Sequence, residues 1–233
     1  MSNHRFMRRA AKGLLFSSIA FSASSYASSY YNCANATGCV AVTSLSATSD
    51  YAKTKYPIVL AHGLGGWNKL FGLVDYFNGI PQDLTKNGAS VYVTKTSSVN
   101  DTEVRGEQLL QQVKTIIAIT GSPKVNLMGH SQGGIDIRYV AGVAPLLVSS
   151  VTAISSPEQG SKMADWTVKM VTEGSAADGL PAGEFNTASL MAIKFFELVG
   201  GAMDIGSGVP LNQLQQQDGW AAVNALTTNS VSY

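Results

Sequence analysis

The ten residues Val125 to Gly134, VNLMGHSQGG, decide the fold of this chain. They contain the pattern G-x-S-x-G, formed by Gly129, Ser131 and Gly133. This pattern requires a sharp turn from a strand into a helix, which holds the serine strained with its hydroxyl exposed. The short apolar run before Gly129 suits the strand, and the residues up to Val143 are compatible with the helix. We therefore predict that Ser131 is a nucleophile at the C-terminal end of a buried strand.

Working outward, three more short apolar runs predict strands: Tyr56 to Ala61, Ser90 to Thr94, and Val151 to Ile154. Apolar runs without alternation suit strands that are buried on both faces. Apolar residues at three- and four-residue steps predict a helix from about Glu103 to Ile119, with Gly121 as its stop. Strands that alternate with helices at this spacing indicate an α/β fold with a mainly parallel sheet.

A second chemical element, His62 to Gly66 (HGLGG), directly follows the first predicted strand. Acyl transfer passes through a tetrahedral intermediate whose negative oxygen must be met by preorganised backbone N–H groups. The N–H groups of Leu64 and Gln132 are the natural pair for this oxyanion hole. Taken alone, the loop could be a plain strand-to-helix turn, but its coincidence with the serine turn favours the catalytic interpretation.

The start of the chain has the order of a secretory signal peptide. A basic segment is followed by the short apolar stretch Gly13 to Ala23, too short to span a bilayer, and by small residues. We expect residues 1–27 to be this signal and the protein to be secreted, extracellular via the periplasm. The 16 basic and 15 acidic residues include four basic ones before Ser28, so the charge without the signal is about −3. No basic run interleaves with aromatics, so no nucleic acid partner is expected.

Residues 28–55 are rich in Ser, Ala, Thr and Tyr and predict an N-terminal lead-in that lies along the surface. The two cysteines of the chain, Cys33 and Cys39, fall in this segment. Because export implies an oxidising compartment, we expect one disulfide with a small loop. The alternative is two free thiols in a flexible tail. The spacing fits no metal site.

Three stretches together resemble the secreted bacterial triacylglycerol lipases of the Pseudomonas–Burkholderia type. They are Tyr56 to Gly66 (YPIVLAHGLGG), Val104 to Val113 (VRGEQLLQQV) and Val125 to Gly134 (VNLMGHSQGG). The resemblance runs from about Tyr56 to Trp166 and continues more loosely to the end. It implies that residues 56–233 form an α/β-hydrolase (lipase) domain, a mainly parallel sheet with helices on both faces. It also implies hydrolysis of lipid esters at an interface by acyl-enzyme formation.

The resemblance assigns roles to individual positions. Ser131 is then the nucleophile, and Leu64 and Gln132 supply the oxyanion hole. Arg105 matches a family position that braces the oxyanion loop. The remaining supporting positions are His62, Gly63, Gly129 and Gly133.

Further properties are implied by the same resemblance. A helical region at about 174–205 would correspond to a mobile lid, although its apolar segment Leu190 to Val199 could equally be a buried core helix. Family members use a dedicated membrane-bound foldase and a secretion machinery as partners. No cofactor is expected, because the calcium site of the family belongs to a C-terminal part that this chain lacks.

The chain departs from the family in its catalytic base. A serine hydrolase needs a base for the serine proton and an acid that orients the base, and in this fold both follow the serine. The histidines of the chain are His4, His62 and His130, and none follows Ser131. Aspartates do follow it, but none has a recognisable triad-acid setting. The sequence thus predicts a C-terminally incomplete lipase with little turnover.

Two other readings stay open. The first is a non-catalytic protein of the α/β-hydrolase fold that binds lipid or a partner through the open pocket. The second is a weak esterase in which His62 turns inward and serves as a substitute base. His130 is a poorer candidate, because neighbouring side chains at a strand end point in opposing directions.

Overall fold

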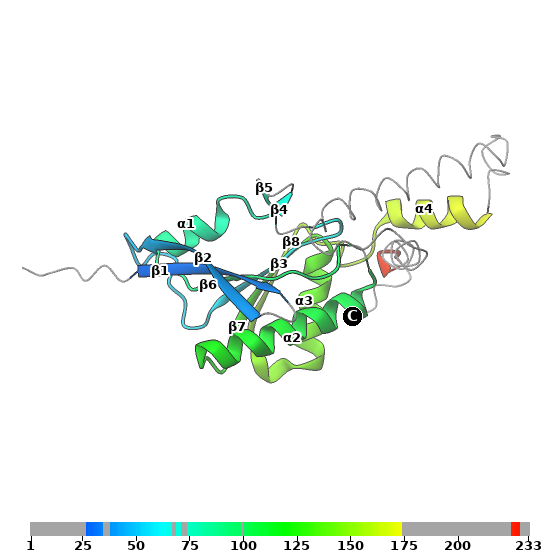
Figure 1. Ribbon diagram of the computed structural model, residues 1–233. Helices are drawn as coiled ribbons and strands as arrows, with labels where there is room; N and C mark the ends of the chain where they lie inside the picture. The colour runs from blue at the N-terminus through cyan, green and yellow to red at the C-terminus, as the bar shows by residue number, and fades with distance from the viewer. Residues whose placement is uncertain are drawn as a thin grey trace, which may run out of the picture.

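A computed structural model describes residues 27–34, 38–66, 69–70, 74–98, 100–173 and 225–228. In Figure 1 six of the labelled strands form one sheet with helices on either side, and β4 and β5 lie apart from it. None of the helices in this described part is long and apolar enough to cross a membrane. Our expectations about the signal peptide, apart from Ala27, and about the lid-like region at 174–205 fall outside the described residues.

The elements follow one another along the chain in alternating fashion. The main sheet has the strand order β2-β1-β6-β3-β7-β8, and β4 pairs with β5 alone. The strands are β1 (Ala27–Ala34), β2 (Gly38–Ser46), β3 (Ile58–Ala61), β4 (Lys69–Leu70), β5 (Val74–Asp75), β6 (Val91–Val93), β7 (Val125–His130) and β8 (Val148–Ile154). The helices are α1 (Ile80–Lys86), α2 (Thr102–Thr120), α3 (Gln132–Val143), the short 3-10 helix η1 (Pro145–Leu147) and α4 (Lys162–Glu173).

The sheet is mainly parallel, as the sequence predicts. Strands β6, β3, β7 and β8 run parallel to their neighbours, and only the β1–β2 pair is antiparallel. At the carboxyl end of the central pair, Ala61 of β3 lies opposite Gly129 of β7. The loop after β3 and the turn after β7 therefore leave the sheet side by side, which brings the two predicted chemical elements together.

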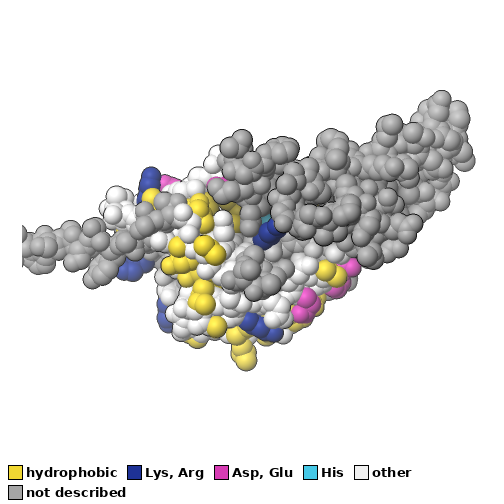
Figure 2. All heavy atoms as spheres, in the orientation of Figure 1, with side chains coloured by type: hydrophobic (Ala, Val, Ile, Leu, Met, Phe, Trp, Pro, Cys, Tyr) yellow, Lys and Arg dark blue, Asp and Glu magenta, His cyan; other side chains and the backbone are white. Residues whose placement is uncertain are grey.

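Helices cover both faces of the sheet, which confirms the expected architecture. On one face, Val59 and Leu127 pack in a core cluster with Leu109 of α2 and Val140 of α3. On the other face, Ile58 and other strand residues pack with the residues around α1. Neighbouring residues of β3 thus enter different cores, because successive side chains of a strand point to opposite faces. In Figure 2 the described part of this face is mostly white and yellow, with separate small groups of dark blue and magenta side chains.

Helix α2 forms where its apolar spacing predicts it. Leu109, Val113 and Ile116 of its apolar stripe are fully buried, and Ile117 is partly buried. The side chain of Asp101 caps its start by accepting a hydrogen bond of 2.8 Å from the Val104 N–H. The helix ends at Gly121, whose φ of 64° is the left-handed conformation that glycine adopts readily.

The expected surface lead-in is wrong for residues 27–46. They form the β1–β2 hairpin, and β1 joins the parallel part of the sheet by pairing with β6. Tyr30 and Cys33 are only 3% and 1% exposed. A shift of register between Tyr30 and Tyr31 interrupts the regular alternation of faces, which removes the period that would have revealed the strand. The predicted disulfide is confirmed, because Cys33 is bonded to Cys39 directly across the hairpin.

Strand β8 differs from the expectation of burial on both faces. Val151 is 40% exposed and Ile154 is 45% exposed. Among the described residues, β8 is the last strand of the sheet, with β7 on one side and α3 packed against it. An apolar composition therefore identified the strand correctly but not its position at the edge.

Candidate active site

Ser131 stands at the sharp turn that the motif requires. It lies between β7 and α3 with φ 55° and ψ −127°, one of two non-glycine residues with positive φ in the described chain. Two backbone bonds hold it there, from the Ser131 N–H to the Ile154 carbonyl and from the Gly134 N–H to the Ser131 carbonyl. Such a conformation costs about 1–3 kcal/mol and persists only where its surroundings enforce it. Its hydroxyl has no hydrogen-bond partner among the residues described.

The glycines on either side of the serine are required by close backbone approach. A Cβ on Gly129 would lie 2.1 Å from the Gly133 carbonyl oxygen. A Cβ on Gly133 would lie 2.4 Å from the Ala61 carbonyl oxygen at the end of β3. Side chains at these positions would therefore push α3 away from the sheet and move the serine.

The loop after β3 rests directly on the serine. A Cβ on Gly63 would lie 2.7 Å from Ser131 Cβ and 3.1 Å from Ser131 Oγ. The sequence alone could not show this contact, because it depends on the pairing of β3 with β7. The backbone of Gly63 therefore lies directly beside the Ser131 side chain.

Two N–H groups on the segments that meet at the serine have no hydrogen-bond partner among the described residues. In the described part of the chain, the Leu64 and Gln132 N–H groups make no hydrogen bond, although Gln132 is fully buried. The other three N–H groups of the Gly63 to Gly66 loop donate to the Tyr76 hydroxyl, the Ser98 carbonyl and the Gly63 carbonyl. Buried N–H groups such as that of Gln132 are rarely left unpaired in folded proteins.

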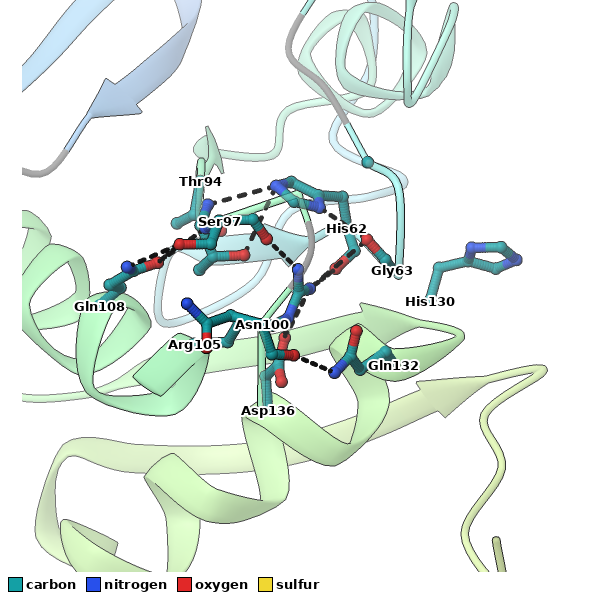
Figure 3. A network of polar contacts seen from close by, with 12 residues as sticks. His62, Gly63, Thr94, Ser97, Asn100, Arg105, Gln108, His130, Gln132 and Asp136 are labelled. Atoms are coloured by element: carbon teal, nitrogen blue, oxygen red, sulfur yellow. Dashed lines mark hydrogen bonds and ion pairs between the residues drawn. The ribbon is translucent and has the colours of Figure 1, made fainter. Parts of the chain in front are cut away.

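Arg105 is buried between α2 and the loop after β3. Its guanidinium donates to the His62 carbonyl oxygen at 2.7 Å, to the Asp136 carboxylate at 2.9 Å, and to the Ser97 carbonyl oxygen. Figure 3 shows these bonds radiating from one side chain to three separate segments. These contacts match the bracing role that the resemblance implies for Arg105. The guanidinium binds carbonyl groups of the loop, and the N–H groups of the loop remain for other partners.

Asp136 accompanies Arg105 on α3. Both side chains are completely buried, and Arg105 Nη2 lies 2.8 Å from Asp136 Oδ2. Burial raises the pKa of the Asp136 carboxyl to about 6, although the positive charge of Arg105 acts in the opposite direction. Sequence reasoning did not single out Asp136, because no local pattern shows that an aspartate in the first turns of α3 meets an arginine of α2.

His62 cannot serve as a substitute base in this arrangement. Its ring is 1% exposed, with Nδ1 at 2.9 Å from the Gly63 carbonyl oxygen and Nε2 accepting from the Thr96 N–H at 3.2 Å. Since a carbonyl can only accept and an N–H can only donate, the ring carries its proton on Nδ1 and has no free lone pair. Burial, with Arg105 nearby, lowers the pKa of His62 to about 3. Figure 3 shows the ring on the Ser97 side of the loop, away from His130.

His130 is engaged by a residue that the sequence analysis missed. Its Nδ1 lies 2.5 Å from the hydroxyl of Tyr76, which also accepts the Gly63 N–H at 3.1 Å. Tyr76 follows β5 in a turn, and burial raises the pKa of its phenol. No signal in the sequence marks this tyrosine, because its partners lie 13 and 54 positions away.

Two glutamines of α2 hold the segment that faces the oxyanion loop. Gln112 accepts the Lys95 N–H at 2.9 Å and donates to the Lys95 carbonyl at 2.7 Å. Gln108 accepts the Ser97 N–H at 2.7 Å. Arg105 and these glutamines fall in the same VRGEQLLQQV stretch, which thereby anchors the loop after β6 to one face of a helix. Within the described residues, no cluster of three or more His, Cys, Asp or Glu side chains could hold a metal ion.

Comparison with known proteins agrees with this architecture. Residues 56–196 match the family model described as the alpha/beta hydrolase fold. Among solved structures, the Bacillus licheniformis lipase BlEst2 in its propeptide form matches with a TM-score of 0.51 and 24% identity, over 78% of this chain and 32% of that one. A likeness at this identity supports the fold alone.

Similar curated proteins are more informative about sequence. The triacylglycerol lipase of Vibrio cholerae is 47% identical over 178 residues, which are 76% of this chain and 52% of that protein. The triacylglycerol lipase of Burkholderia plantarii is 42% identical over 185 residues, 78% of this chain and 48% of that protein. The chain spans about half the length of these relatives.

Proposed function

The chain belongs to the alpha/beta hydrolase fold family, and from that premise we propose that it is a serine ester hydrolase of the triacylglycerol lipase type. Ser131 is the proposed nucleophile, and esters of lipids are the proposed substrates. The names of the relatives from Vibrio cholerae and Burkholderia plantarii support this substrate class.

One observation carries the proposal. Leu64 and Gln132 present N–H groups that are unused among the described residues, on the two segments that meet at Ser131. An ester carbonyl bonded to Ser131 Oγ would develop its negative charge at these two donors. Backbone donors that are already oriented stabilise such a charge without the cost of reorganising water.

The proposed reaction has two displacements. Ser131 Oγ forms a bond to the ester carbonyl carbon, and the bond from that carbon to the alcohol oxygen breaks. The serine proton passes to a base and from there to the departing alcohol. Water then adds to the acyl-enzyme in the same way and releases the carboxylic acid, so that only side chains and water are needed.

The base for this proton is the missing element within the 233 residues. His62 is held neutral with both ring nitrogens engaged, and His130 is bonded to Tyr76. No histidine follows Ser131 in the sequence. We therefore expect the 233-residue chain to turn over esters at a rate lower by about four to six orders of magnitude than a complete triad would allow.

Chemical rescue tests the proposal directly. The purified chain is assayed with p-nitrophenyl butyrate over a range of imidazole concentrations, beside Ser131→Ala. Free imidazole is small enough to accept the serine proton at an open site, so the rate above imidazole's own background should rise with imidazole in the parent chain only. Ser150→Ala, which changes a serine bonded to Asn126 on the exposed strand β8, is the matched control and should behave as the parent.

The result distinguishes the function from the fold. An imidazole-dependent rate that Ser131→Ala abolishes would support an activated serine. Equal rates in the parent and in Ser131→Ala, with circular dichroism showing that both are folded, would contradict the proposed nucleophile. A high rate without imidazole would show that another group of the chain acts as the base.

We also propose that the protein is exported by a signal peptide over residues 1–27, with a lipase-specific foldase and a secretion machinery as partners. The Cys33–Cys39 disulfide supports an oxidising compartment. Fractionation of an expressing bacterium, with N-terminal sequencing of the product, tests the first part. A full-length product in the cytoplasm with free thiols would contradict it.

A further inference from the structure

Tyr76 joins the two segments that make the site. Its hydroxyl lies 3.1 Å from the Gly63 nitrogen, in the loop after β3, and 2.5 Å from His130 Nδ1, at the end of β7. The residue comes from neither segment, since it stands in the turn between β5 and α1. One oxygen atom therefore holds the loop of Leu64 to the strand that carries Ser131.

The direction of both hydrogen bonds follows from chemistry. The Gly63 N–H can only donate, so the tyrosine oxygen accepts it. The phenol proton is then available for the lone pair of His130 Nδ1, which leaves the His130 proton on Nε2. Burial keeps this phenol protonated by raising its pKa. The ring is fixed as well, with an edge-on contact to Phe77 at 4.9 Å between centroids.

This arrangement determines which N–H of the loop faces the substrate. Gly63, Gly65 and Gly66 have their N–H groups fixed by Tyr76, Ser98 and Gly63. The peptide plane between His62 and Gly63 is held by Arg105 at its carbonyl and by Tyr76 at its N–H, so without the bond to Tyr76 it would be fixed at one end only and Leu64 could shift with it. We propose that Tyr76 is a positioning residue that aligns the Leu64 N–H with Ser131, through a hydrogen-bond relay from Gly63 to the Tyr76 hydroxyl to His130. This inference deepens the proposed function and rests on it.

Tyr76→Phe removes the hydroxyl and keeps the ring in its contacts. Tyr139→Phe is the matched control, because the Tyr139 hydroxyl binds Glu107 at 2.7 Å on the exposed surface of the helices. The first readout is hydrogen exchange of the Gly63 amide by NMR. We expect this exchange to accelerate about tenfold in Tyr76→Phe, which corresponds to the loss of a hydrogen bond worth about 1.4 kcal/mol, and to stay unchanged in Tyr139→Phe.

The second readout is affinity for 4-fluorophenylboronic acid, followed by fluorine NMR. Boron accepts the Ser131 oxygen, the serine proton goes to the buffer, and the negatively charged adduct resembles the tetrahedral intermediate. Tyr76→Phe should weaken this adduct about tenfold, less than the roughly hundred- to thousandfold loss expected for one oxyanion donor. In imidazole-rescued hydrolysis the same variant should lower kcat and leave KM unchanged, as expected for a contact used mainly in the transition state. Because a smaller folded fraction would also lower kcat, the folded fraction of each protein is measured by circular dichroism.

His130 supplies a conservative rescue. An asparagine at position 130 places an amide oxygen near the place of Nδ1 and keeps the acceptor, whereas alanine removes it. We expect His130→Asn to resemble the parent and His130→Ala to resemble Tyr76→Phe, with no further loss in the double variant Tyr76→Phe/His130→Ala. Additive losses would overturn the relay.

The outcomes separate this inference from the proposed function. If the parent binds the boronic acid no better than Ser131→Ala, the proposed function fails, and with it the positioning role. If the parent binds it and Tyr76→Phe binds it equally, with parent-like exchange at Gly63, only the inference about Tyr76 is overturned.

Discussion

Arg105 and Asp136 form an ion pair of 2.8 Å with neither side chain exposed to solvent. The two residues come from α2 and α3, and the same guanidinium also binds the His62 carbonyl. The charge pair therefore connects two helices and the oxyanion loop at one point. Because the pair is excluded from solvent, it contributes more to the position of these elements than to net stability. Loss of either partner would leave a buried charge unpaired and destabilise the fold.

The first prediction follows from that sensitivity. Asp136→Asn keeps the shape but leaves the buried guanidinium without its countercharge, and Arg105→Met leaves the carboxylate and the His62 carbonyl without a donor. Each variant should lower the free energy of unfolding by about 3–5 kcal/mol, measured by urea titration. The double variant Arg105→Met/Asp136→Leu should lose less than the sum, because no buried charge is left alone. Strictly additive losses would contradict the pairing.

The second prediction concerns pH. Burial lowers the pKa of His62 to about 3 in the folded chain from its ordinary value of 6.5, so on acidification the unfolded chain binds this proton first. Its contribution to stability is complete above pH 6.5 and is lost on acidification, by about 1.4 kcal/mol per pH unit down toward pH 3. NMR of the ring should show a neutral imidazole with its proton on Nδ1 at pH 5.

Asp136 also titrates over part of this range, because burial raises the pKa of its carboxyl. A comparison with His62→Gln separates the two, since glutamine also offers a donor and an acceptor and Asp136 is present in both proteins. The difference in unfolding free energy between parent and His62→Gln should shrink between pH 7 and pH 5. A constant difference would show that His62 has no lowered pKa.

The elements nearest the serine could be predicted from the sequence because their signals are local. The glycines of the turn, the apolar run of β7 and the stripe of α2 each act within a few residues. The contact of Gly63 with the serine depends on the pairing of β3 with β7, and the contacts of Arg105 join separate elements, so both needed the structure. Tyr76 and Asp136 were missed, because their contacts join elements that are distant in the sequence and produce no local sequence pattern.

The N-terminal hairpin was missed for a different reason. Its strands are built from small and polar residues, and the register shift after Tyr30 interrupts their alternation. Burial there comes from contacts with distant parts of the sheet, such as the stacking of Tyr31 on Tyr92 at 4.9 Å between ring centroids. Composition indicated a surface segment because it carries no information about such pairing.

The third prediction tests the hairpin. The disulfide joins Cys33, which is buried, to Cys39 across the two strands, with a sequence separation of 6. By closing this short loop, the disulfide lowers the conformational entropy of the unfolded chain and so stabilises the fold by about 2 kcal/mol. The free energy of unfolding of Cys33→Ala/Cys39→Ala, measured by urea titration, should therefore be lower by that amount. Reduction of the disulfide in the parent should lower it equally. An unchanged midpoint would show that the hairpin is held by strand pairing alone.

The last prediction compares two variants, each of which adds one methyl group at a glycine. In Gly63→Ala the new Cβ would meet Ser131 Cβ at 2.7 Å and the His130 carbonyl oxygen at 2.9 Å, both parts of the turn that holds the nucleophile. Since backbone and Cβ atoms cannot move aside alone, the loop must shift, and we expect imidazole-rescued hydrolysis to fall by about a hundredfold, the low end of the loss of an oxyanion donor. Gly142→Ala is the matched control, because nothing lies within 4 Å of its Cβ and it stands inside α3. It should raise the free energy of unfolding by about 0.5–1 kcal/mol through helix propensity and leave the rescued rate unchanged. Equal rescued rates in both variants would show that the loop of Gly63 does not lie against the reacting serine.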